Sequence, residues 1–137
     1  GITCVDALLG TWIWTEVCRK SSDRAGVPVV PCYMYALTRE KRLPPMASVR
    51  KSVYSLLKPR KRKSDEVNIL GYFSPLQDDC ELYSLLKSAG VKTIRELSRC
   101  DTFEEYEKMS QANFSLVLNA EARYAAQQME QELNIPL

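Results

Sequence analysis

The sequence predicts an α/β fold with a mostly parallel sheet, and three short apolar runs in its second half carry that prediction. The runs cover residues 67–73, 91–97 and 114–118, and each leads into a stretch with the apolar spacing of a helix. A fourth run begins at Ile135 and stops at Leu137. We therefore expect a Rossmann-like, three-layer domain whose parallel sheet is truncated at the last strand.

Composition limits the chain to one sizeable core, since it has 137 residues of which 45% are hydrophobic and 26% charged. A net charge of +2 does not by itself indicate a nucleic-acid or membrane partner. No apolar run approaches the roughly 20 residues that cross a bilayer. The N-terminus lacks the basic region and cleavage pattern of a signal peptide, so we expect a cytoplasmic protein.

Cysteine and histidine usage excludes several kinds of site. The five cysteines form no close pairs, which argues against a disulfide framework and against a C-x-x-C zinc site. The chain has no histidine, which removes Ser-His and Cys-His nucleophilic chemistry and the commonest ligand of transition metals. No catalytic residue is expected.

The first half of the chain reads as two helices with a short strand between them. Apolar spacing predicts a helix over residues 5–19, closed by a polar loop at 21–26, and residues 27–30 read as a buried or edge strand. A second helix is expected to start at Pro45, because proline is tolerated in a first helical turn, and to stop at Pro59.

Residues 58–65 form the only strong charge run and divide the chain. We expect residues 1–65 to be a helical and single-strand lead-in segment and residues 66–137 a βαβαβα Rossmann-like half, both within one compact domain of a larger subunit. The run itself reads as a solvated linker. Contact with an acidic partner surface or a nucleotide, and contact with nucleic acid, are the alternatives, although no aromatic or glycine residue is interleaved with its charges.

The second half of the chain contains several residues that are typical of helix ends. Asp78 or Asp79 is expected to cap a helix, and residues 102–105 have the spacing of a capping box. Asn119 is the expected cap of the last helix, and Asn134 is suited to the left-handed turn after it. The inner side of the helix after Asp79 is expected to consist of Leu82, Leu85, Leu86 and Ala89.

The loop over residues 71–79 follows the first strand of this half, at the edge where parallel sheets bind ligands. It offers only Gly71 before the helix, whereas a dinucleotide loop needs several glycines so that backbone amides can approach the pyrophosphate. A nicotinamide or flavin site and a Walker lysine loop are therefore not expected. Asp78 and Asp79 read as a cap rather than a catalytic pair, since no base partner lies nearby in the sequence.

Four segments of the chain resemble those of a known family. The pattern Cys4-x-x-x-Leu-Leu-Gly10, the strand 27–29 leading to Cys32, Asn68-Ile-Leu-Gly-Tyr72 and the stretch from Asn119 to Pro136 are similar, in this order, to the component 1 family of nitrogenase-type oxidoreductases. That family includes the molybdenum-iron protein subunits, their cofactor-assembly scaffolds and the dark-operative protochlorophyllide and chlorin reductases.

The resemblance implies an oxidoreductase subunit with an iron-sulfur or related metallocluster held between domains and subunits. It implies a paired component 1 subunit and an ATP-dependent iron-sulfur reductase as partners. Cys4 stands at the family's cluster-ligating cysteine, and thiolate is a suitable ligand for iron. Residues 73–79, 98–101 and 119–121 would line a cofactor or substrate cavity. The candidate cofactor-binding residues are Gly71, Phe73, Ser74, Asp78, Asp79 and Asn119.

The sequence also departs from the family pattern. Thr11 and Trp12 replace two acidic residues, Tyr33 and Met34 replace a Gly-Phe pair, and the helix after Pro45 lacks the histidine that the molybdenum-iron protein places near its cofactor. Two functions therefore stay open. One is a domain of a nitrogenase-like reductase subunit, and the other is a non-catalytic metallocluster or tetrapyrrole carrier, or a small-ligand scaffold, of the same fold.

The chain ends read as those of a piece of a longer protein, because there is no initiator methionine and the last residues fall inside an expected strand. A four-iron cluster needs about four ligands. We therefore expect the isolated fragment to bind no cluster, to catalyse nothing, and to be able to dimerise through an open sheet edge.

Overall fold

The structure, a computed structural model, describes residues 11–32 and 43–137. Its centre is a three-stranded parallel sheet of β1 (Glu66–Leu70), β2 (Thr93–Glu96) and β3 (Phe114–Val117), in the order β2-β1-β3. β2 and β3 fall inside their apolar runs, and β1 begins one residue before its run. The α/β, Rossmann-like fold predicted from the sequence is thus confirmed.

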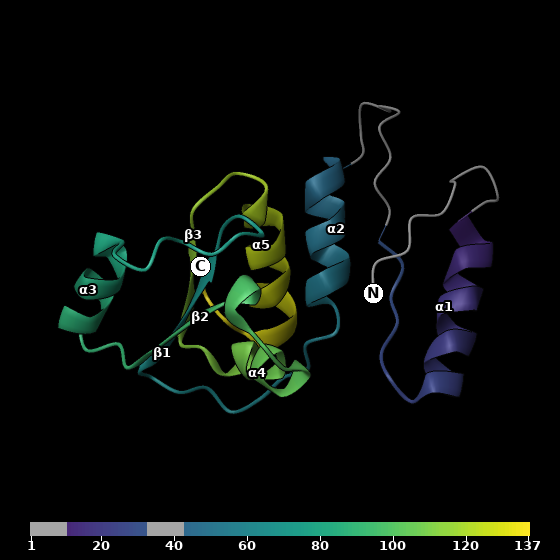
Figure 1. Cartoon of the computed structure of the whole chain (residues 1–137), viewed down its shortest axis with the longest axis horizontal. Helices are drawn as coiled ribbons and strands as arrows, with labels where there is room; N and C mark the ends of the chain where they lie inside the picture. The colour runs from purple at the N-terminus through teal and green to yellow at the C-terminus, as the bar shows by residue number, and fades with distance from the viewer. Residues whose placement is uncertain (1–10, 33–42) are drawn as a thin grey trace.

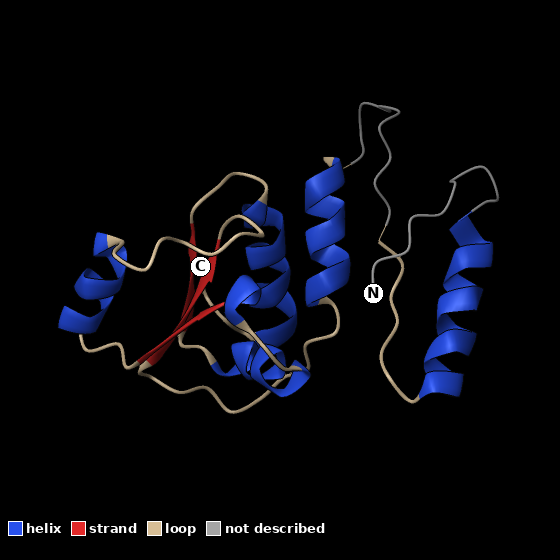
Figure 2. Ribbon diagram, in the orientation of Figure 1, coloured by secondary structure: helices blue, strands red, loops and turns tan. Residues whose placement is uncertain are grey.

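Helices cover both faces of this sheet, and Figure 2 shows the strands between them. On one face lie α5 (Ala122–Leu133), α4 (Phe103–Glu107) and α2 (Pro45–Tyr54), with α2 packed alongside α5. On the other face lies α3 (Glu81–Ser88), as Figure 1 shows. Short 3-10 turns, η2 (Leu97–Arg99) and η3 (Lys108–Gln111), follow β2 and α4.

Strand order determines where a ligand can enter. The chain moves from β1 to β2 on one side, and then returns past β1 to place β3 on the other. Right-handed crossovers in opposite directions put their helices on opposite faces, as α3 and α4 are placed here. The connections that leave the carboxyl ends of β1 and β3 consequently run to opposite faces of the sheet, which makes this a topological switch point, where ligands bind in open α/β sheets.

The core lies between the sheet and α5. All five residues of β1 are buried, as expected for a central parallel strand covered on both faces. Leu70 packs among α2, α4 and α5 side chains, and Asn68 reaches the same side, where its Nδ2 donates to the Met109 carbonyl at 2.8 Å. Small residues of α5 let this helix approach the sheet closely. The fully buried members of the core with the largest volumes are Leu70, Met109, Met129, Ile135 and Val67.

The first helix and the expected strand differ from the sequence prediction. Helix α1 spans Thr11–Ala25 and ends at Gly26, which has a left-handed φ of 67°. The stretch 21–26, expected to be a polar loop, is therefore mostly helical, because Arg19 and its neighbours form ion pairs at helical spacing with Glu16 and Asp23. Residues 27–30 form no strand; Pro28 lies within this stretch and Pro31 follows it, and no strand pairs with it in the described part of the chain. Residues 5–10 lie outside the described part.

Helix α2 starts at Pro45, as predicted, and this proline occupies the first turn. It ends at Tyr54 rather than at Pro59. The end is set by Ser55, whose amide closes the last turn on the Lys51 carbonyl, and the chain then turns at Leu57.

Helix α3 was predicted wrongly in two respects. None of its residues is buried, and Leu85, expected on the inner side, is 64% exposed. Neither Asp78 nor Asp79 caps it, because Cys80 occupies the N-cap position without a side-chain bond and Asp78 instead pairs with Arg99. The amphipathic spacing is real, but the helix covers little of the sheet.

Two other turn predictions are confirmed. Thr102 and Glu105 form the reciprocal capping box at the start of α4. Asn134 adopts the left-handed conformation after α5, with φ of 56°. The prediction that Asn119 caps α5 is wrong, because Glu121 occupies the N-cap position; Asn119 lies in the turn before it, where its Oδ1 accepts the Ala122 amide at 2.7 Å.

The last residues lie beside β3. They are not assigned as a strand, but the Pro136 carbonyl accepts the Ser115 amide at 2.8 Å and Ile135 is completely buried. The chain thus begins to pair at the edge where the fourth run was expected. Among the described helices, none is long and apolar enough to cross a membrane.

Candidate functional site at the sheet switch point

The carboxyl ends of β1 and β3 meet closely. Leu70 pairs with Val117 in the ladder, and the next residues, Gly71 and Leu118, touch. A Cβ built on Gly71 would stand 3.4 Å from the Leu118 Cβ. An alanine at position 71 would therefore make an ordinary contact with Leu118, the first residue after β3, and a larger side chain would meet the Leu118 side chain.

Arg50, in α2, occupies this switch point. Its side chain is 4% exposed, and it is the only buried basic side chain in the described part of the chain. Its Nη2 donates to the Gly71 carbonyl at 2.7 Å, and Nη1 lies 3.4 Å from Glu121 Oε2 at the start of α5. The guanidinium also lies over the Phe73 ring at 4.6 Å from the centroid, which favours a cation. Arg50 therefore joins α2, the end of β1 and the start of α5.

Arg50 was not among the residues predicted for the site. The buried residues of α2 are Ala47, Arg50 and Tyr54, at helical spacing. A lone arginine inside such a stripe must find partners when it is buried, since an unpaired charge is costly in the interior. The spacing of Arg50 from Ala47 and Tyr54 is therefore the sequence signal for this residue.

A cavity of about 450 Å³ opens next to the Arg50–Glu121 pair. Glu121 is 45% exposed and forms part of its wall, so its carboxylate faces both the buried guanidinium and the cavity. The cavity is open to solvent, and Arg50 is not among the residues that line it. Its lining residues are Pro44, Ala120, Glu121, Arg123, Tyr124 and Gln127.

A second polar cluster holds the loop 71–79 over the carboxyl end of β2. Glu96, 5% exposed, accepts the Leu76 amide at 3.0 Å and the hydroxyl of Tyr83. Arg99 donates to the Leu76 carbonyl at 2.6 Å and to Asp78 at 2.7 Å. Burial first, and then the hydrogen bond to the Glu96 carboxylate, raise the pKa of Tyr83 above its ordinary value. These contacts hold the loop in place, and the Asp78 carboxylate pairs with Arg99 instead of pointing into a ligand site.

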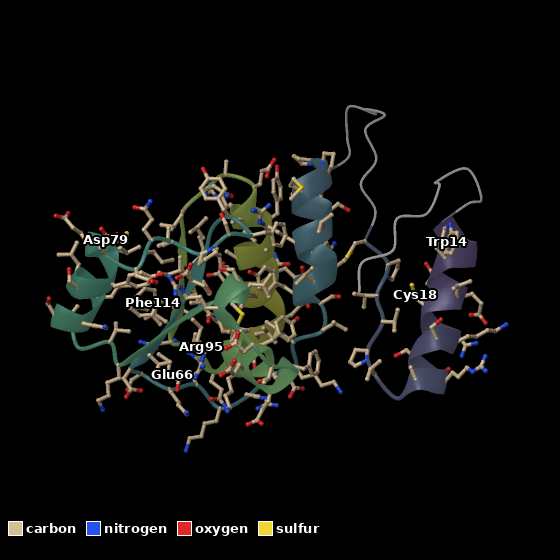
Figure 3. The ribbon with its side chains drawn as sticks, in the orientation of Figure 1. Trp14, Cys18, Glu66, Asp79, Arg95 and Phe114 are labelled. Carbon is tan, nitrogen blue, oxygen red and sulfur yellow. The ribbon has the colours of Figure 1, made fainter. Side chains whose placement is uncertain are left out.

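The structure separates the candidate residues into two groups. Gly71 and Phe73 surround Arg50 at the switch point, and Asn119 follows β3 one residue after Leu118. Asp78 belongs to the cluster at β2, together with the loop 98–101. Ser74 and Asp79 are exposed, and Figure 3 shows Asp79 near the start of α3, on the opposite side of the sheet from α5.

The described residues do not supply a metal-ligand set. Within residues 11–32 and 43–137, no three cysteine, aspartate or glutamate side chains are grouped to hold a metal ion. Cys18, Cys32, Cys80 and Cys100 are free thiols on separate elements. Burial raises the pKa of Cys32 and of Cys100, which disfavours the thiolate that iron requires. Cys4, the expected ligand, lies outside the described residues.

The fold and this site together define a class of protein. It is a doubly wound α/β domain in which a buried arginine and an adjoining cavity mark the switch point between β1 and β3.

The model of the nitrogenase component 1 type oxidoreductase family matches residues 2–137, and the chain belongs to that family. It is 24% identical over 138 aligned positions to the nitrogenase iron-molybdenum cofactor biosynthesis protein NifE of Nostoc sp.. This alignment covers 98% of the chain. It is 31% identical to the protein of the same name from Rhizobium meliloti over 66% of the chain. The matched segments span 28% and 19% of the lengths of these two relatives.

Proposed function

We propose that this domain forms one wall of a cavity for a metallocluster or its precursor in a component 1-type subunit, in a holding role. The observation that carries the proposal is the position of Arg50, which is buried behind Glu121 at the switch point of a fold that binds ligands there, while Glu121 lines an open cavity.

The charge of Arg50 suits such a ligand. Iron-sulfur clusters and their thiolate ligands are anionic overall, and burying an anion is costly unless a cation lies close to it. Arg50 is held in place by Gly71 and Phe73, so it does not have to be ordered when a ligand arrives. Arg123 is the cation among the residues that line the cavity, beside the carboxylate of Glu121, and Arg50 lies behind that carboxylate.

A holding role is favoured over reduction by two observations. Both relatives are named as cofactor biosynthesis proteins. The chain also has no histidine to serve as a proton donor or as a ligand near the cavity. The alternative is a reductase subunit in which this domain lines the substrate cavity and the reacting groups come from other parts of the protein.

The cluster ligands themselves belong elsewhere. We assign Cys4 as one ligand at an interface between subunits, with the others supplied by further segments or by the paired subunit. The described residues then contribute shape and charge, and no bond to the metal. A paired component 1 subunit, an ATP-dependent iron-sulfur reductase as electron donor, and a cytoplasmic location are part of the same proposal.

The test uses the full-length gene product, expressed anaerobically with its paired subunit. Iron content and visible absorption are measured for the wild-type protein, for Cys4→Ala, and for Cys32→Ala as a matched control at a second free cysteine. We expect the wild-type protein and Cys32→Ala to contain iron and Cys4→Ala to lose most of it. An iron-free wild-type protein would contradict the proposal.

A second measurement separates holding from reduction. The iron-loaded protein is mixed with a cluster-free acceptor of the same family, with and without ATP and the reductase. A carrier passes its iron to the acceptor, whereas a reductase subunit keeps its iron and consumes ATP while reducing substrate. Retention of iron together with substrate turnover would assign the reductase role instead.

A further inference from the structure

The basic run 58–63 follows the amino edge of the sheet, opposite to the switch point. It leads into β1, while Lys92 precedes β2 and Asn113 precedes β3. Figure 1 shows the segment passing below the sheet between α2 and β1, and Figure 3 shows Glu66 and Arg95 at the same lower edge. We call the side chains of Lys58, Arg60, Lys61, Arg62, Lys63 and Lys92 the amino-edge ridge.

The second half of this segment is held against the domain. The Lys63 amide donates to the Gln111 carbonyl at 2.8 Å, and Arg62 donates to Asn113 Oδ1 at 2.8 Å. Asn113 donates back from Nδ2 to the Ser64 carbonyl at 3.3 Å. These bonds fix the path of the backbone at residues 62–64.

The ridge has more cations than carboxylates to pair with. Arg60 pairs with Glu107 at 2.9 Å, Lys63 with Glu66 at 2.9 Å and Lys92 with Asp65 at 3.1 Å. In the described part of the chain, no carboxylate lies within salt-bridge distance of the three remaining cations, Lys58, Lys61 and Arg62. The first two are exposed, and Lys92 remains 80% exposed despite its partner.

The acidic residues that lie among the cations of the ridge favour a protein surface, and not a polyanion, as its binding partner. Asp65 and Glu107 lie among the cations and would repel a continuous row of phosphates, and a typical duplex site uses several more phosphate contacts than three unpaired cations provide. No aromatic residue is interleaved with the run for stacking on bases. Discrete carboxylates on a partner can meet the unpaired cations while avoiding the ridge's own acids.

We propose that the amino-edge ridge is a docking surface for an acidic face of a partner protein. The surface lies at the opposite end of the strands from the Arg50 cavity, so a partner bound there leaves the cavity open. The interaction is steered by charge and weakens as salt increases.

The probe is a short peptide of alternating glutamate and serine, titrated into the 137-residue chain and followed by calorimetry at low and at physiological ionic strength. The ridge variant is Lys58→Gln with Lys61→Gln. The control is Lys20→Gln with Arg24→Gln on α1, which removes the same charge from a helix away from the sheet. Circular dichroism checks that both variants fold.

We expect the peptide to bind at low salt, the ridge variant to bind about tenfold more weakly, and the control to differ less than twofold from wild type. Equal losses in both variants would show an effect of net charge alone and would overturn the proposal. So would an absence of binding at low salt, or tighter binding to duplex DNA or to phosphatidylglycerol vesicles than to the peptide.

Discussion

Arg50 Nη2 lies 2.7 Å from the carbonyl oxygen of Gly71, and this bond attaches the middle of α2 to the first residue after β1. The carbonyl is at a strand end, where the ladder no longer supplies a donor. Arg50 thus satisfies a backbone group of the sheet with a side chain from the first half of the chain. The packing of α2 and the shape of the switch point depend on the same contact.

Replacing Arg50 with methionine is expected to lower the free energy of unfolding by about 2–4 kcal/mol. The change keeps an unbranched stem but leaves the Gly71 carbonyl without its donor and removes the cation from the Phe73 ring. Urea unfolding measures the effect. Arg123→Met is the matched control, since this arginine is exposed and should change stability by less than about 0.5 kcal/mol. Equal effects of the two variants would contradict the structural role of Arg50.

Alanine substitutions at Gly71 and Gly90 separate two effects of an added side chain on stability: strain in the backbone and contact with neighbouring atoms. At Gly90 nothing lies within 4 Å of an added Cβ, but its φ of 91° is strained for any L side chain, so Gly90→Ala should cost about 1–2 kcal/mol. At Gly71 the added Cβ meets Leu118 at 3.4 Å, an ordinary contact distance, so Gly71→Ala should be nearly neutral. Thermal unfolding compares the two. A larger loss for Gly71→Ala than for Gly90→Ala would show that the strands approach more closely than described.

Leu85 and Met129 test how much each helix contributes to the core. Met129 is 1% exposed in α5, and Met129→Ala should cost about 2–5 kcal/mol because it opens a cavity. Leu85 is exposed in α3, and Leu85→Ala should cost less than about 0.5 kcal/mol. Denaturant midpoints provide the measurement. A costly Leu85→Ala would restore the sequence prediction that this leucine faces the sheet.

Glu66 should make stability depend on pH. Burial opposes its ionisation, but hydrogen bonds from Lys63 and Arg95 outweigh burial and hold the pKa of Glu66 below its usual value. A lowered pKa in the folded state stabilises the protein above the ordinary glutamate range, about pH 4.3, and the contribution is lost as the pH falls through the lowered pKa.

Glu66→Gln should therefore flatten the acid side of a plot of unfolding free energy against pH. Urea unfolding at a series of pH values from neutral to acid would show this. Glu104→Gln is the control, because its pair with Lys108 lies on the surface. If wild type and Glu66→Gln lose stability in parallel, the carboxylate is not preferentially ionised in the folded state.

The sequence predicted the elements whose signals are local. The capping box at Thr102 and the left-handed Asn134 depend on a few neighbouring residues, and both were found where expected. The strands of the second half were also correct, since runs of apolar residues between helices leave few alternatives. The short strand at 27–30 was wrong because prolines and valines resemble a strand locally while no neighbouring strand lies beside them.

The candidate site was less predictable because it is built from distant segments. Arg50, Gly71 and Glu121 come together only after the sheet has formed. The role of Asp78 was misjudged for the same reason, because Arg99, across the loop, competes with the helix start for its carboxylate. Periodicity indicates which side of an element faces inward, but it does not identify the charged group that this side will contact.

Strand order also constrains how this sheet can assemble. Since β1 is central, its pairing with β2 closes a loop that contains only α3, while its pairing with β3 closes a longer loop that contains α3, β2 and α4. The longer closure costs more chain entropy and places more distant residues in contact, which slows folding. The β1–β3 seam, where Gly71 meets Leu118, should therefore form late, and changes at this seam should alter the rate of folding less than the rate of unfolding.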